Sequence, residues 1–150
     1  MQTIAVNDAY LPYLDCNARV QIFYGGSASG KSVFLAQRPI IDISRGGRNY
    51  LIARQIGRTI RGSVSMELQK VITNSGLSAA FNINKTDGTI TNIQTGNQII
   101  FSGLDDVEKL KSITPAKGAI TDIWIEEATE TDRASVKQLL KRQRGGDKNT

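Results

Sequence analysis

The sequence predicts an α/β fold, a three-layer sandwich with a mainly parallel central sheet and an antiparallel hairpin insertion. Short β-branched and aromatic runs alternate with stretches whose apolar residues recur at helical spacing, an order typical of parallel strands covered by helices. In the middle of the chain the pattern changes to strict alternation around turn signals, which indicates antiparallel strands. We expect right-handed crossovers between the parallel strands.

The first strand is expected over residues 19–24, which are mostly β-branched or aromatic and end at Gly25-Gly26. A helix should begin at about Lys31 and end at Gly46-Gly47. Because Pro39 lies inside this helix, we expect a kink or an early end there. One helix face should carry the apolar side chains Val33, Ala36, Ile40 and Ile43.

A second strand, a second helix and the hairpin are expected next. Residues 50–54 read as the strand, and Gly76 should end the helix. The apolar residues at helical spacing before it are Val64, Leu68, Val71 and Ile72. Phe81 and Ile83 then alternate with polar residues. The turn signals Asp87-Gly88 and Thr95-Gly96-Asn97 separate further strands at 90–93 and 99–101.

Three elements complete the expected fold. Asp105 and Glu108 have capping-box spacing for a short helix through Leu110. Residues 119–125 form a nearly continuous apolar run, which favours a strand buried on both faces of the sheet. Residues 134–144 form a basic amphipathic helix, whose inward side chains should be Val136, Leu139 and Leu140.

Composition limits the classes of function. The 150 residues fit one domain. There is no histidine and one cysteine, Cys16, so histidine catalysis and an internal disulfide are excluded and a structural zinc site is disfavoured. No apolar run approaches the roughly 18 residues that span a bilayer, so we expect no membrane contact. The net charge of +5 permits binding to nucleic acid, although a basic soluble surface is the simpler explanation.

The segment from Gly25 to Ser32 matches the Walker A pattern G-x-x-x-x-G-K-[ST]. Its glycines allow backbone N–H groups to turn toward a polyphosphate, and the helix that follows adds the positive end of its dipole. Lys31 should reach the β- and γ-phosphates, and the Ser32 hydroxyl should bind Mg²⁺. The alternative is a chance glycine-rich turn. The phosphate-binding residues are expected to be Gly25, Gly26, Ser27, Ala28, Ser29, Gly30, Lys31 and Ser32.

Residues 123–127, Ile-Trp-Ile-Glu-Glu, end a predicted strand with two acids and match a Walker B motif. Ligands of open α/β sheets bind at the carboxyl ends of the strands. We expect Glu126 to hold Mg²⁺ through water and Glu127 to polarise the attacking water. The alternative is that both acids only begin the next loop. Trp124 is expected to pack in the core. Together with Walker A, this predicts an ATP-binding P-loop NTPase of the ASCE type.

Several polar residues are weaker candidates. Arg54 and Arg58, or Arg61 in the same turn, could stabilise the transition state from this chain or toward a neighbouring subunit, or could be solvated surface residues. Gln21 and Tyr24 could contact adenine, or face the core or solvent.

Two charged groups have simpler explanations. Asp105 and Asp106 look like a metal pair, but helix capping accounts for them. A face with Lys137, Lys141, Arg142 and Arg144 could touch DNA phosphate or remain solvated.

These motifs together resemble the ATPase domain of the large terminase subunit of tailed phages and prophages. The resemblance covers about residues 17–145. The matching segments are 24–32, Arg54 with 58–63, 103–112 and 123–128. Many terminases carry arginine where Ser27 stands, which leaves an arginine role to Arg54 or Arg58.

The resemblance implies an ATPase motor that packages double-stranded DNA into procapsids in the cytoplasm of the bacterial host. Implied partners are double-stranded DNA, a small terminase subunit, a portal protein and further copies in a homo-oligomeric ring. Terminases continue with a coupling strand and a nuclease domain. We therefore expect residues 1–150 to be a P-loop ATPase domain truncated before both, without nuclease activity.

Two alternatives stay open at this point. The chain could be a nucleotide-binding module with little turnover, as a truncated remnant would be. It could also be another P-loop enzyme, such as a helicase or a small kinase.

Overall fold

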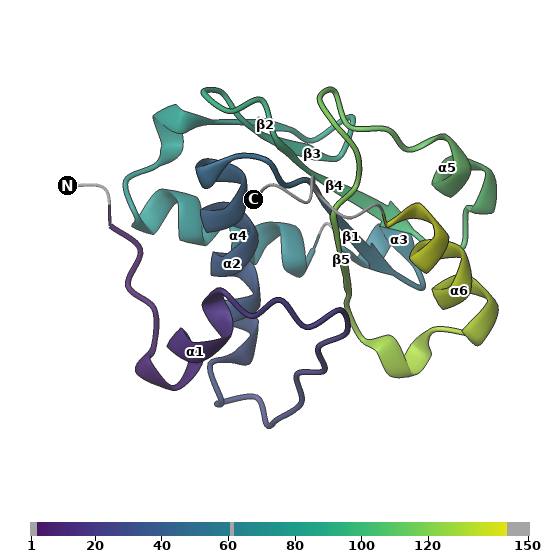
Figure 1. The fold of residues 1–150 in the computed structure, drawn as a ribbon, viewed down its shortest axis with the longest axis horizontal. Coiled ribbons are helices and arrows are strands. Elements are labelled where there is room, and N and C mark those ends of the chain that lie inside the picture. The colour runs from purple at the N-terminus through teal and green to yellow at the C-terminus, as the bar shows by residue number, and fades with distance from the viewer. Residues whose placement is uncertain (1–2, 61, 144–150) are drawn as a thin grey trace.

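The computed structural model describes residues 3–60 and 62–143, which form an α/β fold around one five-stranded sheet. The strand order is β2-β3-β4-β1-β5. Strands β1 (Tyr50–Arg54), β4 (Gln98–Gly103) and β5 (Asp122–Ile125) are parallel. Strands β2 (Phe81–Asn84) and β3 (Thr89–Asn92) add an antiparallel hairpin at the β4 edge. The sheet is therefore mixed, and its hairpin lies at an edge (Figure 1).

Helices cover both faces of the sheet. Helix α2 (Lys31–Arg45), α3 (Gly57–Ile60) and α4 (Val64–Asn74) pack on one face. Helix α5 (Val107–Ser112) and α6 (Arg133–Arg142) lie on the other side of β1 and β5 (Figure 1). The short elements are α1 (Leu11–Leu14) and the 3-10 turns η1 (Asp8–Tyr10), η2 (Ser78–Ala80) and η3 (Ala128–Glu130).

Two apolar clusters form the core, one on each face of the sheet. Because successive side chains of a strand point to opposite faces, β1 contributes Ile52 to one cluster and Leu51 to the other. The larger cluster joins α2 and α4 to the sheet, with Ile40 and Leu68 fully buried. The smaller cluster packs α6 against the sheet through Leu139. This confirms the three-layer arrangement.

Helix α2 differs from expectation in two ways. It runs from Lys31 to Arg45 without a break, and Pro39 is buried inside it, so the expected early end is wrong. Gly46 ends the helix with a φ of +92°, as predicted. Val33 was expected to face the core, but it is 48% exposed. It lies in the first turn, beside the cavity of the glycine-rich loop, where no strand covers it.

The strand expected over residues 19–24 does not form. Val20, Ile22 and Tyr24 are 65%, 81% and 91% exposed, and residues 21–26 have no regular structure. Strand β5 is an edge strand of the described sheet, and its one neighbour there is β1. Residues 19–24 make no ladder hydrogen bonds to the open edge of β5, and without such pairing β propensity alone does not make a segment a strand.

Residues 119–125 form a shorter and less buried strand than expected. Only Asp122–Ile125 form a strand, and their side chains are half-buried rather than buried. An edge strand has one neighbour, so its side chains are covered less completely than those of a central strand. The apolar run therefore predicted the presence of a strand correctly, but the prediction that the strand is buried on both faces is wrong.

Two helix boundaries move slightly. The N-cap of α5 is Asp106, whose carboxylate accepts a hydrogen bond from the Lys109 N–H at 2.9 Å, and not Asp105. Helix α6 begins at Arg133, after the N-cap Asp132. Leu140, expected to face inward, is 40% exposed. Within the described ranges, no helix has the length and apolar character needed to cross a membrane.

Candidate nucleotide-binding site

The glycine-rich loop lies at the start of α2 and adopts a compact turn. The Ser29 N–H donates to the Gly26 carbonyl at 3.1 Å. Gly30 is the N-cap of α2 and has a φ of +76°, a conformation that side chains other than glycine rarely adopt. A Cβ at Gly25 would lie 3.1 Å from Ser29 Oγ, a tight contact that rotation of the serine side chain could relieve. The geometry of the loop thus explains the glycine at position 30.

An open cavity of about 290 Å³ lies over this loop. Its lining also includes Glu127, which follows the end of β5 and is far from the loop in sequence. The loop residues that line it are Gly25, Gly26, Ser27, Ser29, Gly30, Lys31 and Ser32. The fold therefore places the second glutamate opposite the Walker A loop. Ala28 does not line the cavity.

A second cavity of about 240 Å³ adjoins the first at Ser32. Glu126 and Trp124 line it from β5, and the first turns of α4 line it from the other side. The α4 side includes Ser63, Glu67 and Lys70. Ser32 and Glu126, the two expected metal-binding residues, thus face one space.

The two glutamates leave β5 in different directions. The Glu126 N–H donates to the Ala53 carbonyl at 2.9 Å, which continues the β1–β5 pairing by one residue. The Trp124 indole Nε1–H donates to Glu126 Oε2 at 3.1 Å. Glu127 then has φ +51° and ψ +54°, and it is the one non-glycine residue with a positive φ in the described part of the chain. Such backbone strain is often found at functional sites.

Burial raises the pKa of Glu126 above its ordinary value, and the neighbouring Glu127 carboxylate raises it further. The hydrogen bond from Trp124 and the charges of Arg54 and Lys31 oppose this rise in pKa. The positive charge of Lys31 thus acts on the Glu126 carboxyl across a large separation in sequence. The adjacent acids Glu126 and Glu127 and the distant Lys31 therefore share one electrostatic environment.

A family model for the phage terminase large subunit matches residues 17–150. The chain belongs to this family. It is 33% identical over 109 residues to the terminase large subunit of Bacillus phage SPP1, which covers 73% of this chain and 26% of that protein. It is 32% identical over 124 residues to the PBSX phage terminase large subunit of Bacillus subtilis strain 168, covering 83% of this chain and 28% of the relative.

The fold is also similar to a solved terminase structure. The large terminase of a thermophilic bacteriophage superposes with a TM-score of 0.61 at 17% identity, over 79% of this chain and 29% of the other. The chain therefore spans just over a quarter of the length of the terminases that it matches.

The arginines expected at the site lie in different surroundings. Arg54, at the end of β1, lies with its Nε 3.6 Å from Glu130 Oε2, and its charge reaches Glu126. Arg58 is exposed on α3, and Arg61 lies outside the described residues. In this member of the terminase family, Arg54 is thus the expected arginine, among those the structure describes, whose charge acts on Glu126.

Of the two candidate adenine contacts, Gln21 is engaged within the protein. Its amide nitrogen donates to the Cys16 and Ala18 carbonyls at 3.0 and 3.1 Å. Its amide oxygen accepts from Arg38 Nη1 at 2.7 Å. Gln21 therefore anchors the segment before the Walker A loop to α2. Tyr24 directly precedes the loop and is 91% exposed.

Hydrogen bonds explain the roles of several charged residues from two sets of weaker candidates. Asp106 caps α5, and Asp105 Oδ1 accepts a hydrogen bond from the Gly57 N–H at 3.3 Å. Arg142, expected on an outer basic face, instead donates to the Leu110 and Ile113 carbonyls, so that assignment is wrong. Arg144 lies outside the described residues. The cations exposed along α6 are Arg133, Lys137 and Lys141.

Two site contacts were missed from the sequence. Trp124 was assigned to the core alone, yet it hydrogen-bonds to Glu126. Their spacing of two residues on a strand was the available signal, since such residues share a face. Tyr10 donates its hydroxyl to the Ser29 carbonyl at 2.8 Å, across 19 residues of sequence. No local pattern predicts that contact.

Proposed function

We propose that this chain is the ATP-binding and ATP-hydrolysing motor domain of a phage terminase large subunit, and that it powers packaging of double-stranded DNA into procapsids. The observation that carries the proposal is the convergence of Lys31 and Ser32 with Glu126 and Glu127 around two adjoining cavities. Membership of the terminase family supports the same reaction.

The Walker A loop and α2 supply the groups that bind triphosphate. Backbone N–H groups of a glycine-rich loop and the positive end of a 15-residue helix both favour a polyanion. Lys31, half-buried in the first turn of α2, adds a full positive charge at the β- and γ-phosphates. The motif recognises the triphosphate rather than the base, so the choice of ATP rests on membership of the terminase family.

Ser32 and Glu126 fit a Mg²⁺ site. Both present oxygen atoms, which Mg²⁺ prefers, and both line the cavity beside α4. Across residues 3–60 and 62–143, no cluster of three or more Asp, Glu, Cys or His side chains could hold a metal ion by itself. This agrees with a Mg²⁺ site completed by phosphate oxygens and water. When bound, Mg²⁺ would neutralise charge on the β- and γ-phosphates.

Glu127 is placed to orient the attacking water. It lines the Walker A cavity, and its exposed carboxylate can accept a hydrogen bond from water there. The water oxygen forms a bond to the γ-phosphorus while the bond from that phosphorus to the β–γ bridging oxygen breaks, giving ADP and inorganic phosphate. Lys31 and Arg54 stabilise the negative charge that spreads over the transferred group.

Partners and location follow from the proposed motor role. The partners are double-stranded DNA, a small terminase subunit, a portal protein and further copies of the chain in a ring, in the cytoplasm of the bacterial host. On this chain, the three cations at positions 133, 137 and 141 lie four residues apart on α6 and are exposed. That spacing aligns them on one helix face, which suits contact with DNA phosphates.

Phosphate release with and without double-stranded DNA tests the proposed reaction. Lys31→Ala should abolish ATP binding, and Glu127→Gln should bind ATP but release no phosphate above background. A Glu127→Gln variant that hydrolyses ATP at the rate of the parent would remove the water-positioning role. Glu108→Gln is the matched control, because Glu108 is an exposed glutamate on α5 and should leave turnover unchanged.

A second candidate function is ATP binding with little turnover. It is favoured by the absence of residues 19–24, which lead into the glycine-rich loop, from the described sheet. A loop that no strand precedes depends on side-chain contacts for its position, and hydrolysis depends on rigid positioning. Binding of ATP without phosphate release in the parent chain would establish this second function.

A further inference from the structure

Trp124 connects the core of the protein to the proposed metal site. It is the single tryptophan of the chain. Asp122, Trp124 and Glu126 alternate along β5, so their side chains share the face of the sheet that α2 and α4 cover. The indole ring packs against the apolar cluster on that face, which fixes its position. Its Nε1–H then points out of the core toward Glu126 Oε2, 3.1 Å away.

This contact leaves the Glu126 carboxylate with one oxygen held and one oxygen available. An indole N–H only donates, so it cannot compete with the carboxylate for a cation. A glutamate side chain otherwise moves among several rotamers, and fixing one of them costs entropy on binding. Outer groups that hold a metal-binding carboxylate by a hydrogen bond commonly raise metal affinity in this way.

We propose that Trp124 is a positioning residue for Mg²⁺ binding: its indole N–H holds one oxygen of Glu126 so that the other faces Ser32 across the shared cavity. The inference rests on the proposed function, because it assumes that Ser32 and Glu126 hold Mg²⁺ beside ATP. It adds a role for a residue that packing alone would otherwise explain.

The first experiment measures ATP affinity of the full chain by calorimetry, with Mg²⁺ and with EDTA. Trp124→Phe keeps an aromatic ring in the core but lacks the N–H. We expect about tenfold weaker ATP binding in Mg²⁺ and unchanged binding in EDTA. Met66→Leu is the matched control, since Met66 lines the same cavity and offers no comparable donor; it should bind ATP as the parent does under both conditions.

The outcomes separate the inference from the proposed function. If the parent chain binds no ATP, the proposed function is wrong, and this inference is wrong as well because it rests on that function. If the parent binds ATP more tightly in Mg²⁺ and Trp124→Phe does the same to the same extent, only the inference is overturned. An equal loss of affinity in Mg²⁺ and EDTA would also overturn it, because a purely structural role predicts that result.

A second measurement does not depend on replacing Trp124. With one tryptophan, a ¹⁵N-labelled chain gives one indole N–H resonance by NMR. Glu126→Ala removes the acceptor, so we expect that proton resonance to move upfield, whereas Glu67→Ala in the same cavity should leave it in place. An indole resonance that is identical in the parent and in Glu126→Ala would overturn the inference.

Discussion

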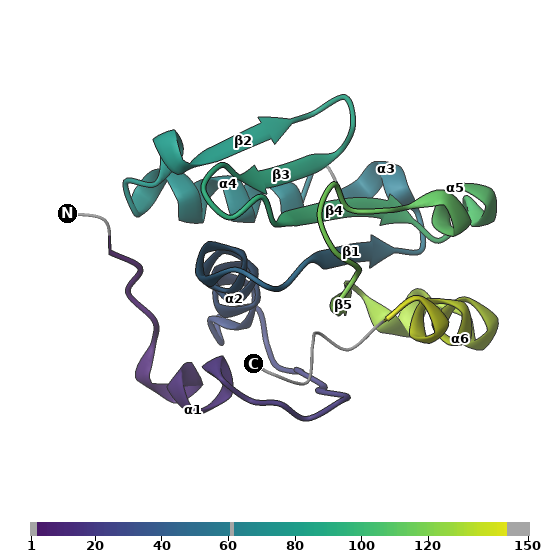
Figure 2. The same ribbon diagram turned by 45° about the horizontal axis from the view of Figure 1, so that its top comes forward.

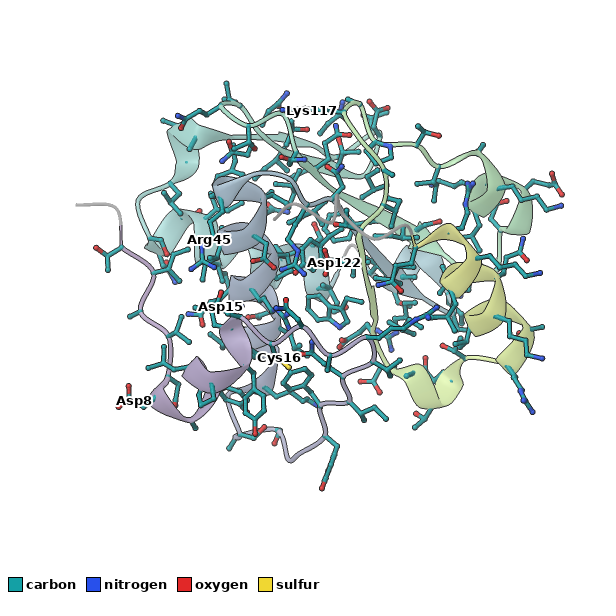
Figure 3. The ribbon with its side chains drawn as sticks, in the orientation of Figure 1. Asp8, Asp15, Cys16, Arg45, Lys117 and Asp122 are labelled. Carbon is teal, nitrogen blue, oxygen red and sulfur yellow. The ribbon has the colours of Figure 1, made fainter. Side chains whose placement is uncertain are left out.

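Tyr10 holds the Walker A loop by donating its hydroxyl hydrogen to the Ser29 carbonyl at 2.8 Å. The Tyr10 ring stacks on Phe34 of α2, with ring centroids 4.8 Å apart and planes 11° from parallel. The segment before the loop is fastened to α2 at a further point, where Arg45 pairs with Asp15 at 2.7 Å (Figure 3). These contacts tie the N-terminal segment and the glycine-rich loop to α2, although both pack outside the sheet (Figure 2).

The first prediction is that Tyr10→Phe weakens ATP binding. The variant keeps the stacked ring and loses the hydroxyl that holds the Ser29 carbonyl. A net hydrogen bond contributes about 1 kcal/mol, so the dissociation constant for ATP should rise by at most about fivefold. Calorimetric titration with Mg²⁺-ATP measures this change.

Tyr13→Phe is the control for this prediction. Tyr13 packs edge-on against Phe23 at 5.9 Å, and within the described ranges its hydroxyl makes no hydrogen bond to the protein. It should bind ATP as the parent does. Equal affinities for Tyr10→Phe and Tyr13→Phe would show that the contact with Ser29 does not shape the loop.

The second prediction concerns backbone strain at Glu127. Its left-handed conformation, φ +51° and ψ +54°, costs a residue with a Cβ about 1 kcal/mol, and glycine avoids that cost. Glu127→Gly should therefore raise the free energy of unfolding by about that amount while it abolishes ATP hydrolysis. Urea denaturation measures the stability. Glu130→Gly, a change within the 3-10 turn η3, should instead lower stability. Lower stability of both variants would exclude relief of strain at Glu127.

Most of the fold could be predicted because the patterns were local. Tyr50–Arg54 was recognised as a strand from its composition, and α4 from apolar residues three and four positions apart. The hairpin followed from turn residues, since Gly88 and Gly96 both have positive φ. Each of these elements forms for reasons contained in about ten residues of sequence.

Residues 19–24 show where that reasoning fails. Their composition is typical of a strand, but a strand needs a neighbour, and the sheet ends at β5. Sheet order depends on pairings between distant segments, which local pattern does not contain. Ile22 is 81% exposed because this segment does not join the sheet, an outcome that its local composition does not encode.

The main candidate residues came from motif spacing, whereas the contacts that support them did not. Motif spacing proposed Lys31, Ser32, Glu126 and Glu127, because phosphate and metal chemistry would restrict residue type at each position, and the fold places them around two adjoining cavities. The supporting contacts of Tyr10 and Trp124 impose no such restriction on the sequence, since many side chains can donate one hydrogen bond. These contacts required coordinates.

The third prediction tests the DNA-binding role proposed for α6. Lys137→Glu should weaken binding to double-stranded DNA and reduce the slope of log K against log salt by about one, the effect expected when one phosphate contact is lost. Lys85→Glu makes the same charge change in the turn between β2 and β3, at the opposite edge of the sheet from β5. Fluorescence anisotropy over a salt series compares the two. Equal slopes of log K against log salt in the two variants would show that DNA does not contact Lys137 on α6.

The fourth prediction concerns a buried ion-pair network at the end of the sheet opposite the glutamates. Arg48 donates to Asp42 at 3.1 Å and to Asp122 at 2.9 and 3.0 Å, and the Tyr50 hydroxyl also donates to Asp42. The Asp42 side chain is 3% exposed, and burial is the main cause that raises its pKa. This carboxylate therefore depends on its partners to remain buried and ionised.

Arg48→Met should lower the free energy of unfolding at pH 7 by about 2 kcal/mol, less than for a fully buried pair because the Arg48 side chain is 34% exposed. The lost positive charge raises the pKa of Asp42 further. A folded-state pKa above the unfolded value means that the folded chain binds more protons, so the variant should regain stability as pH falls from 7 toward the unfolded value of 3.8. Urea denaturation at several pH values measures this slope. Arg48→Met combined with Asp42→Asn removes the titrating carboxylate and should lose the acid-side recovery. The same pH slope in the single and double variants would show that Asp42 does not govern the stability of this end of the sheet.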